Sequence, residues 1–315
     1  MITTLRLVWR MQRWEVLVLI GGPLLLAGAI AVVAWQTSVT LAGLDTCYAA
    51  TGGALSTSCT ALVQSSNGMT GLSPILVGAT TVAPFIVGIL LGAPLVSHEI
   101  EKRTAPIAWS LSLSRVRWLA QRTLPLLIAM AIVLLLLGAA SEALIRATPP
   151  GELGFRFFAM HGPLIAMRGI AVFVIGVVVG LLVGRMLPAI LATGLVVIVL
   201  LIGLQLVREG MMRSEAIWTA ADDRDFSGVM IYGSAYSDDT TGQLVTDEEA
   251  YSRFPDVFGP QGSAKPPGLT QVYLATPPER YPIFVARGIG ELALISLIAA
   301  GLAVWIVGWR RPDVG

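Results

Sequence analysis

The fold is decided by residues 97–122, which read SHEIEKRTAPIAWSLSLSRVRWLAQR. Long apolar runs without a charged residue flank this segment, Leu72–Val96 before it and Thr123–Ser141 after it. A helix needs roughly 20 apolar residues to cross a bilayer, and both runs have about that length. A charged segment between two such runs has to lie in water at a membrane face. We therefore expect residues 97–122 to connect two transmembrane helices and to be open to a soluble partner.

The composition of the chain also indicates a membrane protein. Apolar residues make up 55% of the 315 residues and charged residues 13%, whereas soluble domains have roughly 45–50% and about 25%. The formal net charge of +1 provides no long-range field that would attract nucleic acid. Lys102 and Lys265 are the only lysines and neither follows a glycine, so the chain has no Gly-Lys-Ser/Thr phosphate-binding loop. We expect no ATP site and no enzymatic activity in this chain.

Six segments are long and apolar enough to span a bilayer as helices. They are Val16–Trp35, Leu72–Val96, Thr123–Ser141, Pro163–Gly184, Pro188–Val207 and Pro282–Trp309. The sequence therefore predicts an all-α integral membrane protein with six transmembrane helices. The first segment is longer than the apolar core of a signal peptide, which has about 7–15 residues, so we expect it to be retained.

The basic residues set the orientation, because short cytoplasmic segments carry most of the arginine and lysine. The outer loop between the first two spans, Gln36–Gly71, holds neither residue, whereas the inner segments hold many. Six spans then place both termini in the cytoplasm. Residues 1–15 form a cytoplasmic helix, 16–207 the first five spans, 208–281 an extracellular loop, and 282–315 the sixth span with a cytoplasmic tail.

The two segments outside the spans have distinct characters. Arg6, Arg10 and Arg13 recur at helical spacing, which is typical of an amphipathic helix lying in the interface against anionic lipid headgroups. The loop 208–281 has twelve acidic and six basic residues and many aromatic residues. We expect it to be a large external loop with a small folded element.

The chain has two cysteines, Cys47 and Cys59, and both fall in the predicted outer loop. Cysteines outside the cytoplasm can oxidise, and closing so short a loop would stabilise the fold by about 3 kcal/mol. We therefore predict a structural disulfide between them.

Four ionisable residues lie toward the outer ends of spans: Glu142, Arg168, Arg287 and Glu291. Such groups at membrane depth are functional candidates, and we regard Glu142, Arg287 and Glu291 as candidates for an external gate. Arg287 and Glu291 are four residues apart, so a simple ion pair on one helix face is the alternative. The sequence around His98 and Glu99 lacks the second histidine of a zinc-hydrolase motif, and we expect no metal site.

The connecting segment resembles a known family. The residues Glu99-Ile-Glu101-Lys102-Arg103-Thr104, followed by Ser112, Ser114-Arg115 and Arg117-Trp118, resemble the segment after the second span in ATP-binding-cassette (ABC) exporter permeases of the second class. Many actinobacterial members look like this, although most family members have glycine where Arg103 stands. The six spans, the basic first helix and the external loop between spans five and six match as well. Ser114 is also a plausible N-cap for the helix that enters the third span.

The resemblance implies a coupling segment, residues 97–118, that enters a groove of an ATPase subunit. The implied coupling residues are Glu99, Glu101, Arg103, Thr104, Ser114, Arg115, Arg117 and Trp118. The chain would be the permease subunit of a drug, antibiotic or polysaccharide exporter in the bacterial cytoplasmic membrane, and would move a lipophilic or amphipathic substrate out of the cell. Its partners would be an ATPase dimer, which binds ATP and Mg, and a second permease subunit, either the same chain or a paralogue.

Two other functions remain as alternatives, an ion-coupled carrier and an intramembrane enzyme that acts without an ATPase. Both need clustered ionisable groups inside the spans. The predicted spans have charged residues only near their ends, which favours the permease interpretation.

Overall fold

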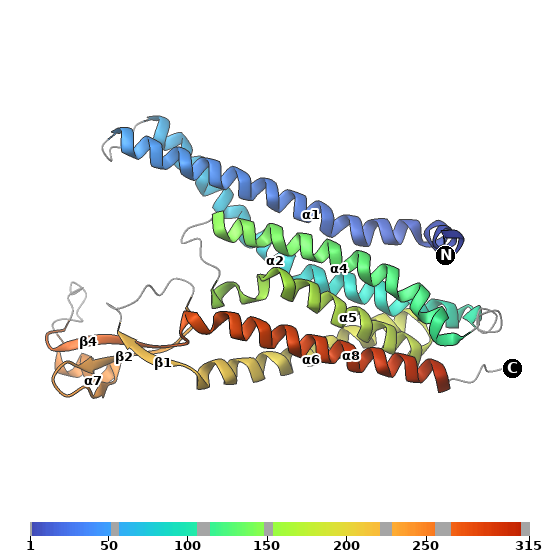
Figure 1. Ribbon diagram of the computed structural model, residues 1–315. Helices are drawn as coiled ribbons and strands as arrows, with labels where there is room; N and C mark the ends of the chain where they lie inside the picture. Colours follow the sequence, from blue (N-terminus) through green and yellow to red (C-terminus); the bar gives the residue numbers. More distant parts are fainter. Residues whose placement is uncertain are drawn as a thin grey trace. The chain divides into compact units, whose positions relative to one another are not determined.

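The computed structural model describes residues 2–51, 57–105, 114–147, 154–220, 229–255 and 266–309. The described chain is mostly helical, and six of its helices are long and apolar enough to cross a membrane. These are α1 (Ile2–Thr51), α2 (Thr57–Glu101), α4 (Arg115–Ala147), α5 (Gly162–Val183), α6 (Met186–Ser214) and α8 (Tyr281–Trp309). The prediction of six spans is therefore confirmed (Figure 1).

Helix α1 contains both the predicted interfacial helix and the first span in one continuous element. The side chains of Arg6, Arg10 and Arg13 lie outside the described part of the chain, as does residue Ser112 of the connecting segment. The orientation of the N-terminal arginines toward lipid therefore stays a prediction.

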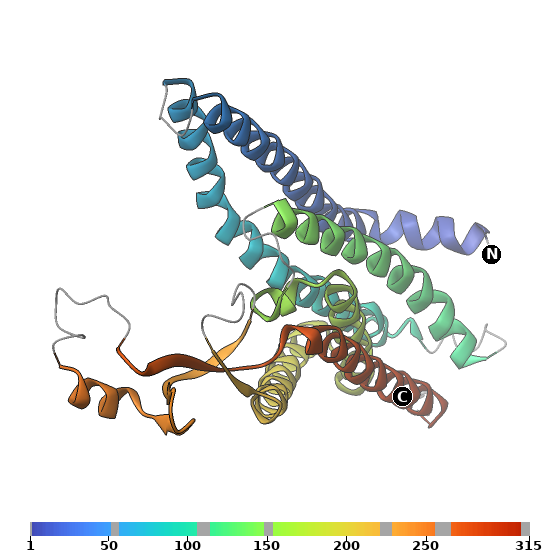
Figure 2. The ribbon, with the colours of Figure 1, turned by 60° about the vertical axis from the view of Figure 1, so that its left-hand side comes forward.

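The predicted outer loop Gln36–Gly71 is wrong in its extent, because most of it is helical. Helix α1 continues to Thr51 and α2 starts at Thr57, so the two helices form a long hairpin (Figure 2). Polar side chains in this part bond back to the helix: the Thr40 hydroxyl donates to the Gln36 carbonyl at 2.9 Å. Such hydroxyl groups find hydrogen-bond acceptors within their own helix, so these polar residues are compatible with a continuous helix. Cys47 and Cys59 form a disulfide across the hairpin, with their Cα atoms 5.9 Å apart.

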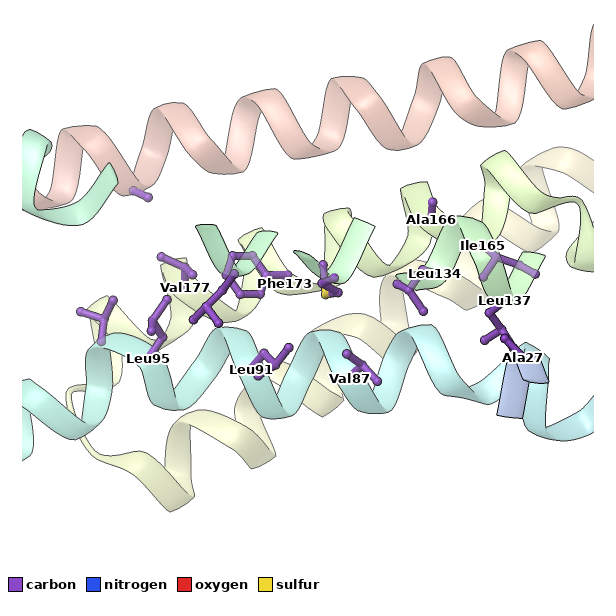
Figure 3. Packing of buried hydrophobic residues seen from close by; sticks show 14 of the residues in the cluster. Ala27, Val87, Leu91, Leu95, Leu134, Leu137, Ile165, Ala166, Phe173 and Val177 are labelled. Atoms are coloured by element: carbon purple, nitrogen blue, oxygen red, sulfur yellow. The ribbon is translucent and has the colours of Figure 1, made fainter. Parts of the chain in front are cut away.

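The chain divides into two compact units. The first comprises the described residues within 1–151, 159–200 and 285–315, and the second those within 152–158 and 201–284. At the centre of the first unit lies α5, of whose span 72% is buried. It packs mainly against α2 and α4, and α1 packs against α4 and α2. The shared apolar core includes Leu91, Leu134, Leu137, Ile165 and Phe173 (Figure 3).

Glycines allow α5 to approach its neighbours closely. A Cβ atom on Gly176 would lie 2.8 Å from the Ala93 nitrogen of α2. Gly180 meets the Ala93 carbonyl, and Gly92 of α2 meets the backbone of Phe173. Small residues permit such backbone contact between helices, which is a main source of association within a bilayer. Gly184 has a different role, since it has a φ of 67° and ends α5 with a bond from its N–H to the Gly180 carbonyl.

The second unit contains a four-stranded antiparallel sheet, which the prediction of an all-α chain missed. The strands are β1 (Ile217–Ala220), β2 (Ile231–Asp238), β3 (Leu244–Val245) and β4 (Leu269–Ala275), in the order β1-β4-β2-β3. A short helix, α7 (Asp247–Arg253), completes this element (Figure 1). Tyr236, Val245, Ala250 and Leu269 form its small core. The strands are short and lie among turn residues, so their hydrophobic pattern is much weaker than that of the spans and did not predict a sheet.

The turn between β2 and β3 is held by Asp238. Its carboxylate accepts hydrogen bonds from the N–H groups of Thr240 (2.9 Å) and Thr241 (3.1 Å). Hydrogen bonds with Thr240 and Thr241 lower the pKa of Asp238 to about 2, because they favour the charged form. At least one acidic residue of this unit, Asp238, therefore stabilises a turn.

The second unit also contains an aromatic cluster. The 3-10 helix η1 (Phe155–Met160) contributes Phe155 and Phe158, whose rings pack edge-on against Tyr281 at the start of α8. The guanidinium of Arg208 lies 4.7 Å from the centre of the Phe158 ring. The Thr276 hydroxyl donates to the Met212 carbonyl at 3.0 Å and joins the end of β4 to the end of α6. These contacts connect the strands to the helices from which they emerge.

Candidate functional site

The predicted coupling residues lie on both sides of the connection between α2 and α4. Glu99 and Glu101 belong to the last turn of α2, and Arg103 and Thr104 follow directly after it. Ser114, Arg115, Arg117 and Trp118 begin α4. Residues 106–113 lie outside the described part of the chain. The described candidates therefore frame the connection.

Helix α2 ends in a Schellman motif that contains an arginine where glycine is usual. The Thr104 N–H donates to the Glu99 carbonyl at 3.0 Å, and the Arg103 N–H donates to the Ile100 carbonyl at 3.1 Å. Arg103 has a φ of 56°, the left-handed conformation that this motif requires. A residue with a Cβ atom adopts it at a cost of about 1–2 kcal/mol. Arg103 is the one non-glycine residue with positive φ in the described chain.

Glu99 forms an ion pair with Arg122 of α4. Both side chains are largely covered, with relative exposures of 15% for Glu99 and 27% for Arg122. The Arg122 guanidinium lies 5.2 Å from the centre of the Trp118 ring, one helical turn earlier, and Trp118 is itself 7% exposed. The cation therefore contacts a carboxylate and an aromatic face at once. This cluster joins the end of α2 to the start of α4.

Glu101 contacts a third helix. Its carboxylate accepts a hydrogen bond from the Met186 N–H, the first residue of α6, at 2.8 Å. The first N–H groups of a helix have no partner within the helix, and a carboxylate there is favoured by the helix dipole. Glu101 is exposed, so we expect a contribution of about 0.5 kcal/mol. The last turn of α2 thus contacts the starts of both α4 and α6.

The start of α4 is capped as the sequence predicts. The Ser114 hydroxyl accepts a hydrogen bond from the Arg117 N–H at 3.1 Å. Arg115 is half-buried and Arg117 exposed. The surface of the described connection is therefore cationic, with Lys102, Arg103 and Arg117 exposed, while the two carboxylates contact this chain itself.

The outer candidates occupy separate places. Glu142 of α4 accepts a hydrogen bond from the Gly162 N–H at 2.7 Å, and His161 Nδ1 lies 3.0 Å from the same carboxylate. Arg146 lies 3.7 Å away. Glu142 therefore caps the start of α5, just as Glu101 caps the start of α6. Arg287 is exposed and Glu291 half-buried on α8.

The sequence analysis missed Arg122 as a site residue and did not predict the partner of Arg168. Arg122 was assigned no role, although its position four residues after Trp118 places both on one helix face. Arg168 is 7% exposed, and its guanidinium donates to the Ala159 carbonyl at 2.6 Å. This carbonyl belongs to η1, just before α5, and no sequence pattern indicates such a partner.

Comparisons with known proteins show the family of the chain. No curated protein and no solved structure matches the chain. A family model described as "ABC-2 membrane transporter related" matches residues 22–208, which is more than half of the chain. The match begins inside α1 and ends near the end of α6. The match includes the connection between α2 and α4 and both residues of its contact with α6, Glu101 and Met186. The chain therefore belongs to the ABC-2 membrane transporter related family.

Proposed function

We propose that this chain is the permease subunit of an ATP-driven exporter and that it moves a lipophilic or amphipathic molecule out of the cell. Family membership and six apolar helices support a multi-pass permease. We further propose that the chain lies in the bacterial cytoplasmic membrane, pairs with a second permease subunit and works with a separate ATPase that binds ATP and Mg. The apolar surfaces of the spans favour a lipophilic substrate over a polar one.

The observation that carries the proposal is the contact of the last turn of α2 with two other helices. Glu99 is paired with Arg122 of α4, and Glu101 accepts from the start of α6. A push on the turn that follows, Lys102–Thr104, therefore acts on three helices together. A free loop could not transmit such a displacement, because it would bend before the helices moved.

Close packing extends the same movement to α5. Its glycines lie against the backbone of α2, so α2 and α5 cannot slide past each other without breaking contact. Packed helices of this kind shift as rigid bodies between discrete arrangements. ATP binding would have to favour the outward-open arrangement by about 5.5 kcal/mol to move the population from 1:99 to 99:1.

The exposed Lys102, Arg103 and Arg117 are the residues that we propose for docking to the ATPase. Glu99, Arg122 and Trp118 would then transmit the movement rather than contact the partner. The role of Glu142, Arg287 and Glu291 at an external gate stays a prediction, and Glu142 has a structural role in addition, since it accepts the Gly162 N–H.

Co-purification tests the proposal directly. The tagged full chain, expressed with the P-loop ATPases of its own genome, should bring down one of them, and the complex should hydrolyse ATP at a rate different from that of the isolated ATPase. The variant Lys102→Glu/Arg117→Glu should lose the ATPase, while Arg253→Glu on α7 should retain it. Transport that continues in cells without any such ATPase would contradict the proposal and favour the ion-coupled carrier.

A further inference from the structure

An apolar groove lies in the first unit between α4, α5 and α8. It has a volume of about 210 Å³, and its walls include Val116 and Leu127 of α4, Phe173 of α5, and Ala300 and Val304 of α8. The polar exception in its lining is Thr123, whose hydroxyl donates to the Leu119 carbonyl at 2.9 Å. The groove therefore offers a ligand no unpaired polar group, and water is not favoured in it.

The wall that α4 contributes to the groove is about as long as one leaflet of a bilayer is thick. On α4 the lining runs from Val116 to Leu127, and eleven rises of about 1.5 Å between them give about 16 Å. Half of a hydrocarbon core of about 30 Å is about 15 Å. Because the volume is small for this length, the groove is long and narrow. That shape suits a single extended hydrocarbon chain better than a compact ring system.

One end of the groove carries the residues that are typical of the membrane interface. Arg117, which is exposed, follows Val116 directly in the first turn of α4. On α8, Val304 is followed by Trp305 and then Trp309, whose side chains are 58% and 76% exposed. The start of α4 and the end of α8 lie at the same end of the first unit (Figure 1). Tryptophan and arginine at this depth indicate the headgroup region.

From these observations we propose that the groove binds one acyl chain of an anionic phospholipid of the arginine-rich leaflet, with its phosphate beside Arg117. The acyl chain is held by dispersion contacts with the groove walls, because the removal of apolar surface from water does not drive binding within the bilayer. The phosphate is attracted by the positive charge of the nearby arginine. Phe173 and Val177, which belong to the core drawn in Figure 3, form part of the groove wall. The bound lipid fills the space between α4 and α8.

The occupant is a resident lipid and not the exported substrate, and this site does not depend on the ATPase. The groove ends at interfacial arginine and tryptophan, where a phospholipid already has its headgroup. An exported molecule would have no reason to require a phosphate beside Arg117. Arg117 takes part in both proposals, so two variants outside this overlap separate them. Ala120→Phe should weaken lipid binding and leave ATPase co-purification unchanged, whereas Lys102→Glu, outside the groove lining, should weaken ATPase binding and leave lipid binding unchanged.

Native mass spectrometry of the full chain in mild detergent tests this proposal. The chain, purified without an ATPase, is titrated with phosphatidylglycerol and with phosphatidylcholine of equal acyl length. We expect one tightly held phosphatidylglycerol per chain and an affinity for phosphatidylcholine that is at least fivefold lower. Ala120→Phe, which fills the groove from its exposed wall position on α4, should weaken phosphatidylglycerol binding about tenfold. Ala139→Phe, at an exposed position on the same helix outside the groove, should not change it.

The variant Arg117→Gln separates the headgroup from the chain. It should remove most of the preference for phosphatidylglycerol and leave phosphatidylcholine binding unchanged. Equal binding of the two lipids by the wild-type chain, or wild-type binding by Ala120→Phe, would overturn the proposal. Monodisperse elution and an unchanged melting temperature of each variant show that any loss is not a failure to fold.

Discussion

At the residue scale, two of the predicted functional carboxylates stabilise helix starts. Glu101 and Glu142, both candidates for a function, accept backbone N–H groups at the starts of α6 and α5. These partners are 85 and 20 residues away in the sequence. The first N–H groups of every helix need an acceptor, and near a bilayer the supply of water is limited. A carboxylate at a span end is therefore as well explained by capping as by transport chemistry.

Arg103 gives a prediction about backbone strain. Its φ of 56° is the conformation that glycine adopts without penalty. Arg103→Gly should raise the free energy of unfolding by about 1 kcal/mol, seen as a higher midpoint of thermal unfolding in detergent. Arg103→Ala should give no gain, since alanine keeps the Cβ atom. An equal gain in both variants would show that the guanidinium, and not the backbone, is unfavourable.

Glu99 and Arg122 give a prediction about charge. Glu99→Gln leaves Arg122 without its carboxylate and should lower stability by about 2 kcal/mol. The swap Glu99→Arg/Arg122→Glu should recover part of that loss. Glu101→Gln is the matched control, because its amide oxygen can still accept the Met186 N–H. The measurements are thermal unfolding and the ATP hydrolysis rate of the complex. If the swap lowered stability by the sum of the losses in Glu99→Arg and Arg122→Glu, the two side chains would not interact.

At the scale of elements, close approach of α5 to α2 determines how the first unit packs. Gly176, Gly180 and Gly184 are four residues apart in the sequence, and the first two lie against α2. Gly184 ends the helix. By contrast, α6 has 11% of its span buried, and Gly194 and Gly203 meet nothing within 4 Å. Glycine thus has a packing role in α5 that it lacks in α6 within this chain.

A pair of matched substitutions checks this difference. Gly176→Ala would place a Cβ atom 2.8 Å from the Ala93 nitrogen, so α2 and α5 must separate, at a cost of about 1–3 kcal/mol. Gly194→Ala meets open space and should stabilise α6 slightly through helix propensity. The thermal midpoint should fall for the first variant and not for the second. Equal midpoints would mean that the contact between α2 and α5 is looser than the structure indicates.

At the scale of the whole molecule, the proposed function depends on the side of the membrane at which the connection between α2 and α4 lies. The arginine distribution predicts that this connection lies in the cytoplasm and that the loop 208–281 lies outside. The disulfide between Cys47 and Cys59 belongs to the opposite end of the α1–α2 hairpin from Glu101, which agrees with an oxidising outer side.

Cysteine labelling tests this orientation. Lys102 and Thr241 are both exposed, and the native cysteines are joined in the disulfide, so a single introduced cysteine can be read without interference. A membrane-impermeant maleimide applied to intact cells should label Thr241→Cys and should label Lys102→Cys only after lysis. Ala105 would be a poor position for such a probe, since it is 1% exposed. Labelling of Lys102→Cys on intact cells would exclude cytoplasmic docking of an ATPase at this turn.

The sequence by itself determined the membrane class, the number of spans and the N-cap at Ser114. These features depend on local composition and on spacing within a few residues, and the physics of each is local. Only the tertiary structure decided that Glu99 pairs with Arg122, that Glu101 caps α6, and that α1 and α2 extend through the predicted outer loop as a helical hairpin. It also showed the sheet of β1–β4. Partners far apart in the chain meet only after the helices have packed, and apolar periodicity carries no information about which of them meet.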